Sequence, residues 1–289
     1  MRYGVKGMRL WTVVPVCCMV VTLQGCETNP YTGRQQLLMT SVSEEMTMGA
    51  QAYQQVKSDP KMRPSQDPRE IEPVKRVAAR IIEAAKRSKY AEMAQQFQWE
   101  VTVIKDDKTM NAFALPGGKI AVYTGIFPVA KMEAGLAAVL GHEVVHALAR
   151  HGAERMSQGQ LTNAALQIAG AAAGGTGDGG LMSQAAMAAL GAGAQVGVLL
   201  PFSRKHESEA DYIGIVLAAE AGYDPRESVG LWERMAQFSG GGGPAEFLST
   251  HPGHDTRIQQ LKKWMPEAVA IYQAKSPGSS SPLPAVGGR

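Results

Sequence analysis

The sequence predicts an α+β fold that is mainly α-helical and contains one small antiparallel β-sheet. Apolar residues recur at helical spacing along most of the chain, as Val74, Val77 and Ile81 do. The alternation typical of strands is confined to residues 99–123. A chain of 289 residues, of which 45% are hydrophobic and 19% charged, is long enough to bury a core, which favours one globular domain with appendages.

The first 25 residues are expected to be a lipoprotein signal peptide. Three basic residues precede an uncharged apolar run from Leu10 to Leu23, which is typical of a targeting segment. The run ends in Leu23-Gln24-Gly25-Cys26, which resembles the lipobox of bacterial lipoproteins, so Cys26 is the expected site of lipidation. A plain secretory signal and an uncleaved membrane anchor are the alternatives.

The charge outside this segment is balanced. The first 25 residues hold three of the 29 basic residues and none of the 26 acidic ones, so the remainder carries equal numbers of both. This balance argues against nucleic acid as a partner, because nucleic-acid binding needs a basic face. All three cysteines lie at or before Cys26, so the exported domain is expected to contain no disulfide. Glu27, in place of an aspartate that would resemble an inner-membrane retention signal, indicates by analogy the periplasmic face of the outer membrane.

Local patterns divide the rest of the chain. Residues 26–40 are polar and rich in turn residues, and we expect a lipidated tether there. Ser41 and Glu44 form a capping-box pattern that predicts a helix toward Val56. The Pro-, Ser- and Gly-rich residues 276–289 are expected to be a disordered tail. Further helices are expected over residues 73–88, 131–150, 205–220, 226–238 and 255–274, with a loose loop at Gly240–Gly243.

Three short strands are predicted over residues 99–104, 111–115 and 120–123. The helix that follows them keeps two glycines, Gly135 and Gly141. Each glycine in a helix interior costs about 1 kcal/mol, so we expect another backbone to approach closely at these positions.

The Ala- and Gly-rich residues 161–201 are expected to form two helices around a flexible loop that covers the site, with a membrane span as the alternative.

A metal-binding pattern lies inside the helix over residues 131–150. His142 and His146 are four residues apart, so both imidazoles project from one face and can bind a single zinc ion. Glu143 is placed to act on a water molecule at that metal rather than on the metal itself. The alternative is a helix with two incidental histidines, but burying them without a partner in so apolar a helix would be costly.

A third ligand must come from elsewhere in the chain, and Glu207 is the best candidate. Asp211 is four residues further along the same helix, where it can accept the Nδ1 proton of a histidine ligand. Glu209 should face away from the site, and His151 should lie on the surface or cap a helix. The alternative is that this segment is only a solvated, charged helix start.

Together with the segments Asn111–Gly118, Arg204–Asp211 and Thr250–Pro252, these motifs resemble the HtpX and CAAX-prenyl-endopeptidase family of zinc metallopeptidases. The soluble lipoprotein branch of the BepA and LoiP type is the nearest match, and Asn29–Arg34 also fits it. The resemblance implies a zincin-like, gluzincin-type metallopeptidase domain over residues 41–275 with one zinc ion per chain. Because BepA-type helical repeats do not follow, the shorter LoiP-like form is expected.

The resemblance also implies a mechanism. Glu143 is expected to be the general base for a water that attacks the peptide carbonyl. His251 would either stabilise the oxyanion or block the zinc as a fourth ligand, and both roles remain open. An extended substrate is expected to add a strand along Asn111, Ala112, Phe113 and Ala114, with Phe113 lining a side-chain pocket.

The expected function is therefore a lipid-anchored periplasmic endopeptidase that cleaves unfolded or misassembled envelope proteins as part of protein quality control. A chaperone or assembly factor for outer-membrane proteins, with proteolysis secondary, is the first alternative. A non-catalytic zinc lipoprotein or a structural lipoprotein is the second, although an intact Glu143 argues against it.

Overall fold

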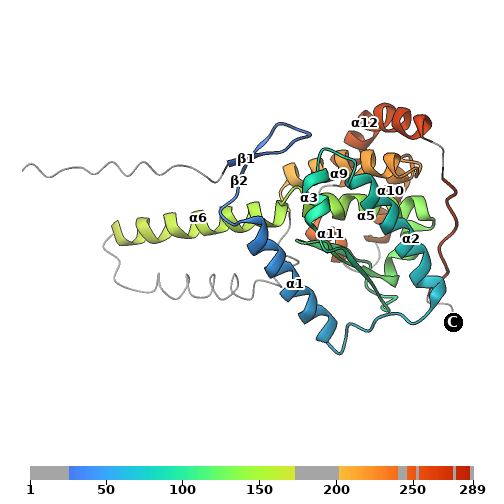
Figure 1. The fold of residues 1–289 in the computed structure, drawn as a ribbon, viewed down its shortest axis with the longest axis horizontal. Coiled ribbons are helices and arrows are strands. Elements are labelled where there is room, and N and C mark those ends of the chain that lie inside the picture. Colours follow the sequence, from blue (N-terminus) through green and yellow to red (C-terminus); the bar gives the residue numbers. More distant parts are fainter. Residues whose placement is uncertain (1–25, 173–201, 240–245, 252–253, 276–277, 287–289) are drawn as a thin grey trace, which may run out of the picture.

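The computed structural model describes residues 26–172, 202–239, 246–251, 254–275 and 278–286. The expected signal peptide and the expected loose loop at 240–243 lie outside the described residues. Of the segment 161–201, for which two helices around a loop were expected, residues 161–172 are helical and residues 173–201 lie outside the described residues. The helices surround a small sheet, and one helix, α6, extends away from the main body (Figure 1). The described helices are α1 (Val42–Ser58), α2 (Pro68–Ala85), α3 (Ala91–Gln96), α4 (Phe127–Ala130), α5 (Glu133–Leu148), α6 (His151–Ala172), α9 (Arg204–Glu220), α10 (Glu227–Ser239), α11 (Glu246–Thr250) and α12 (His254–Ala274).

Capping residues set where the first helices begin. The expected capping box at α1 is confirmed, because the Ser41 side chain accepts from the Glu44 backbone and the Glu44 carboxylate accepts from the Ser41 backbone. Helix α2 starts five residues earlier than expected, since Asp67 caps it and Pro68 fits the first helical position.

The sheet is mixed and not antiparallel throughout, so that part of the prediction was wrong. Its strands are β3 (Glu100–Ile104), β4 (Ala112–Leu115) and β5 (Lys119–Tyr123), in the order β3-β5-β4. The tight turn after Leu115 makes β4 and β5 an antiparallel hairpin, whereas the longer connection after β3 lets β5 pair with it in parallel. Strand β4 is therefore an edge strand.

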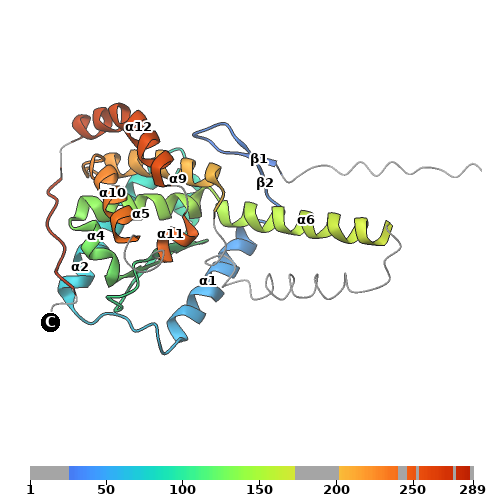
Figure 2. The same cartoon turned by 180° about the vertical axis from the view of Figure 1, so that it is seen from behind.

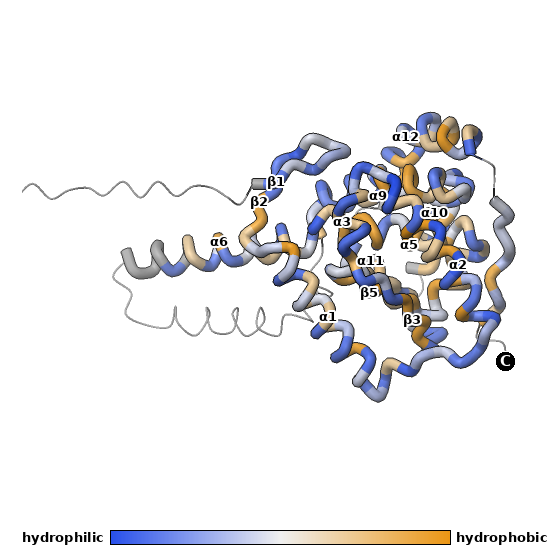
Figure 3. Tube along the Cα trace, in the orientation of Figure 1, coloured by the Kyte–Doolittle hydropathy of each residue, from blue (hydrophilic) through white to orange (hydrophobic). Residues whose placement is uncertain are grey.

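Helix α5 runs through the core and packs against α2, α9, α10 and β4. The predicted close approaches at its glycines are confirmed: a Cβ at Gly141 would lie 2.6 Å from the carbonyl oxygen of Gly214 on α9, and one at Gly135 would lie 2.1 Å from that of Ala130. Hydropathic colouring shows the apolar residues gathered toward α5 and the sheet (Figure 3).

Both ends of the described chain are folded onto the domain. Residues 26–40 are not a loose tether: β1 (Cys26–Thr28) and β2 (Gln35–Leu37) form an antiparallel hairpin whose turn residue Asn29 is wholly buried. We call residues 26–37 the N-terminal hairpin.

The expectation of a disordered tail is wrong for residues 278–286. They lie along the side of the domain opposite α6 (Figure 2). Their backbone bonds to Lys131 and Glu133 at the start of α5, and Leu283 is buried. Among the described residues, no helix combines the length and apolarity that a membrane span requires.

Candidate metal centre

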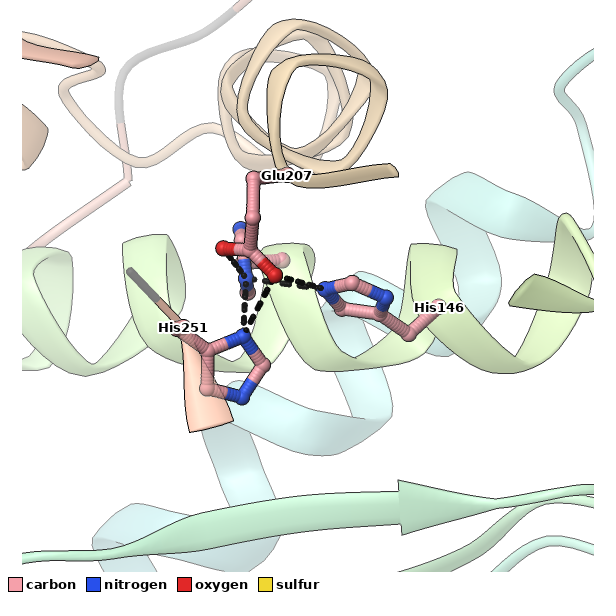
Figure 4. A group of neighbouring side chains, drawn as sticks. His146, Glu207 and His251 are labelled. Carbon is pink, nitrogen blue, oxygen red and sulfur yellow. Dashed lines mark hydrogen bonds and ion pairs between the residues drawn. The ribbon is translucent and has the colours of Figure 1, made fainter. Parts of the chain in front are cut away.

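Three parts of the chain bring four potential metal ligands together. His142 and His146 come from α5, Glu207 from the first turn of α9, and His251 directly follows α11. Their side chains are buried and point toward one another, as Figure 4 shows for His146, Glu207 and His251. One ligand atom from each residue lies within 4.8 Å of every other.

The separations of these atoms suit a single zinc ion. His142 Nε2 lies 3.0 Å from His146 Nε2 and 3.5 Å from a Glu207 oxygen. His251 Nδ1 lies 3.1 Å from His142 Nε2 and 3.0 Å from Glu207 Oε1. A tetrahedral zinc with bonds of about 2.0–2.1 Å has ligand atoms about 3.3 Å apart. His251 therefore stands at a fourth corner of the site in this conformation.

The protonation states also suit a metal, which takes neutral imidazole and ionised carboxylate. Burial, reinforced by the neighbouring histidines, lowers the pKa of His146 well below 6.5. Burial alone would raise the pKa of Glu207, but the charges of His251 and Arg257 outweigh it and lower that pKa. The chemistry of the donor set thus fits zinc.

Glu143 is buried on the next helical position and is poised as a base. Its pKa is raised, mainly by burial and against the opposing charges of His251 and His142. Its Oε1 atom has no hydrogen-bond partner among the described residues and lies 3.5 Å from His251 Nε2. A carboxylate with a raised pKa and a free oxygen beside the ligands can take a proton from a bound water.

Asp211 lies where the sequence placed it, with Oδ1 3.0 Å from His142 Nδ1. Arg257 of α12 was not predicted. Its guanidinium bonds both oxygens of Asp211 at 2.6 Å and lies 2.6 Å from Glu207, while stacking on Trp232 at 3.5 Å. Burial would raise the pKa of Asp211, but the charge of Arg257 and the hydrogen bonds with His142 and Arg257 together outweigh it and lower that pKa to about 2.

His151 is not a surface residue, so that expectation was wrong. Glu209 bonds Thr32, Arg34 and His151 and not the four potential ligands, so it faces away from them as expected, although it is buried. His151 is fully buried, with Nδ1 3.0 Å from His146 Nδ1 and Nε2 3.1 Å from Glu209. The helix containing His146 ends at Leu148, and Arg150 has a φ of 56°. Counting helical positions across that break gives the wrong face for His151.

The expected substrate strand β4 is an edge strand, and Phe113 is not among the residues that line the pocket beside the metal ligands. Asn111 and Ala112 are buried, and the ring of Phe113 packs in an apolar cluster with Tyr53 and Tyr123. An apolar pocket does lie beside the metal ligands, and it is lined by Met48, Ala52, Ala114, Leu115, His146, Met156 and Phe202, among others.

Two helices that carry histidine and glutamate donors, beside a free strand edge, define a zincin-like metallopeptidase domain. Residues 68–265 match the model of Peptidase family M48. The chain belongs to this family of peptidases. This confirms the resemblance at the level of the family.

Named relatives come from mitochondria and from bacteria. Mitochondrial metalloendopeptidase OMA1 of Schizosaccharomyces pombe is 41% identical over 242 residues, which cover 83% of this chain and 66% of that protein. The mitochondrial OMA1 metalloendopeptidase of Homo sapiens is 30% identical over 280 residues, 89% of this chain and 49% of that protein. The β-barrel assembly-enhancing protease of Escherichia coli O157:H7 is 30% identical over 233 residues, 77% of this chain and 44% of that protein. The chain thus spans between about half and two thirds of these relatives.

Proposed function

We propose that this chain is a zinc-dependent endopeptidase that holds one zinc ion on His142, His146 and Glu207 and cleaves extended polypeptides. The observation that supports the proposal best is the cluster of four buried donor residues, in which neighbouring ligand atoms lie 3.0–3.5 Å apart, with the Glu143 carboxylate beside it. Asp211 pairs with the Nδ1 atom of His142, and Arg257 pairs with the carboxylate of Glu207. These partners fix the orientation of the two proposed ligands.

Zinc bound there would polarise the peptide carbonyl and lower the pKa of a water molecule to about 7. Glu143 accepts the proton of that water as its oxygen attacks the carbonyl carbon. Glu143 then passes the proton to the departing amine as the C–N bond breaks. The raised pKa of Glu143 suits both transfers.

His251 regulates access to the site in this proposal. Its Nδ1 atom stands where a water molecule would be needed, at 3.0–3.1 Å from two other donors. Catalysis then requires the His251 ring to withdraw. The ring stacks on Phe247 with the ring centroids 4.4 Å apart, and His251 directly follows α11, a helix of only five residues. Of the two roles considered for His251, this geometry favours blocking.

The substrate adds as a strand along the free edge of β4, at Asn111, Ala112 and Ala114. The C-terminal end of β4 lies beside His146 at the apolar pocket, and Met110, just before β4, bonds to Phe247 of α11. A peptide that adds antiparallel to β4 therefore places a residue from the N-terminal side of the scissile bond in the pocket. That subsite favours an apolar side chain.

The proposed location is the periplasmic face of the outer membrane, through a lipid on Cys26, with unfolded or misassembled envelope proteins as substrates. This part rests on the Leu23–Cys26 motif, on the Asn29–Arg34 segment and on the bacterial relative. The mitochondrial names of the OMA1 relatives describe those proteins. An assembly factor with secondary proteolysis is a second candidate, favoured by the E. coli relative's name, β-barrel assembly-enhancing protease.

The test compares the purified protein with its Glu143→Gln variant. We expect both to hold one zinc ion per chain, and only the unmodified protein to hydrolyse unfolded casein. General-base catalysis contributes about 10²–10⁴-fold, so the variant should lose at least a hundredfold in rate. Unchanged turnover in the variant would remove Glu143 from the mechanism. A variant that still complements a deletion strain would favour the assembly factor.

A further inference from the structure

In each zinc-binding histidine, the ring nitrogen that does not face the metal needs a hydrogen-bond partner. That partner fixes the tautomer and the orientation of the ring. Asp211 serves His142. For His146, the partner is His151, with the two Nδ1 atoms 3.0 Å apart. On its other side, His151 Nε2 lies 3.1 Å from Glu209. A buried line of three side chains therefore leads away from the metal centre.

Only one arrangement of protons satisfies this line when His146 Nε2 faces the metal. His146 Nδ1 then carries a proton and donates it to Nδ1 of His151, and His151 Nε2 donates to Glu209. This requires a neutral His151 and an ionised Glu209.

The N-terminal hairpin completes the line. Arg34 donates from Nε at 2.9 Å and from Nη2 at 2.8 Å to the two oxygens of Glu209, and the Thr32 hydroxyl also donates to this carboxylate. The other side of the Arg34 guanidinium bonds Glu154 at 2.6 Å. Glu154 in turn lies 3.0 Å from His206, whose ring stacks on His151 at 4.6 Å.

The turn sequence explains why Thr32 and Arg34 reach this site. The Asn29 side chain accepts from the backbone of Tyr31 at 2.9 Å, and its carbonyl accepts from Gly33. Gly33 has a φ of 71°, a conformation that favours glycine. This tight turn buries Asn29 and directs the side chains of Thr32 and Arg34 onto Glu209.

We infer that the turn Asn29–Arg34 is part of the metal site, acting through positioning residues. Arg34 and Thr32 fix Glu209, Glu209 fixes His151, and His151 fixes the ring of His146. This inference rests on the proposed zinc function. It assigns a role to the Asn29–Arg34 segment, which precedes the first ligand, His142, by more than 100 residues.

The test measures zinc affinity by chelator competition, together with kcat and KM, in the full chain. His151→Phe keeps a planar ring but removes the acceptor, and His151→Gln keeps one acceptor and one donor. Loss of such an outer partner typically costs 10–100-fold in metal affinity. We expect a loss of this size for His151→Phe, partial recovery for His151→Gln, and about tenfold weaker binding for Arg34→Gln, with unchanged KM throughout.

A matched control separates positioning from general destabilisation. Glu133 is a buried carboxylate at the opposite end of α5, paired with Arg76 and distant from the ligands. Glu133→Gln should leave zinc affinity unchanged.

Wild-type affinity in Arg34→Gln and His151→Phe would overturn the inference, as would an equal loss in Glu133→Gln. Arg34 is partly exposed, so its variant serves even where the buried His151 variants fail to fold. Absence of zinc binding in the unmodified protein would instead refute the proposed function.

Discussion

Gly141 is a point of close backbone approach between the two ligand-bearing helices, and Gly141→Ala perturbs that approach. The new Cβ would lie 2.6 Å from the carbonyl oxygen of Gly214 and 3.3 Å from its carbonyl carbon. Non-bonded heavy atoms prefer a separation of about 3.5 Å, so α5 and α9 must move apart by about 0.9 Å at this point. Neither partner atom can rotate away, because both belong to helix backbone.

Two effects determine the expected change in the free energy of unfolding. Overpacking costs about 1–3 kcal/mol, and the better helix propensity of alanine returns about 1 kcal/mol. The net loss in the free energy of unfolding should be about 0–2 kcal/mol. Metal sites tolerate errors of about 0.2 Å, and His142 and Glu207 sit on the two helices being separated. Zinc affinity should therefore fall at least tenfold, about 1.4 kcal/mol.

Chelator competition and urea unfolding of the zinc-free protein measure the two effects separately. Gly159→Ala is the control, because no described atom lies within 4 Å of its new Cβ on α6. It should leave zinc affinity unchanged and stabilise the helix by up to about 1 kcal/mol. Wild-type zinc affinity in a folded Gly141→Ala protein would refute the argument that the glycine contact sets the spacing of the ligands.

Three further predictions concern the blocking role of His251, the effect of acid on Glu154, and the packing of Leu283. His251→Ala should retain zinc and raise kcat/KM on an unstructured peptide several-fold; a fall would assign His251 to oxyanion stabilisation. Burial would raise the pKa of Glu154, but hydrogen bonds from His206, Arg34 and Gln36 lower it below 4.5. Its stabilising contribution is thus complete above about pH 4.5 and lost as the pH falls toward its folded-state pKa, so Glu154→Gln should flatten the pH dependence of unfolding below pH 4.5. Leu283→Ala should lower the free energy of unfolding by about 2 kcal/mol, measured by urea titration, and an unchanged value would mean that the tail is not packed.

Local spacing was enough to predict part of the site. His142, Glu143 and His146 share one helix, and Glu207 and Asp211 are four residues apart on another, so the helical repeat alone orders them. The capping box at Ser41 was equally local. The close helix approach followed from the cost of a mid-helix glycine.

The remaining features depend on contacts between distant segments. Arg257 lies 50 residues after Glu207, and no local pattern indicates that its guanidinium turns inward. A helix break at Arg150 reversed the expected direction of His151. Alternation identified three strands but carried no information on their direction, which the connection lengths decide.

Zinc content per purified full-length chain tests the central claim most directly. The account predicts one zinc ion per chain in the unmodified protein and in Glu143→Gln, because Glu143 is not a ligand. It predicts that His251→Ala retains the metal and that the double variant Glu207→Ala/His251→Ala loses it, because only the two histidines of α5 then remain. Equal zinc content in the double variant would contradict the proposed ligand set.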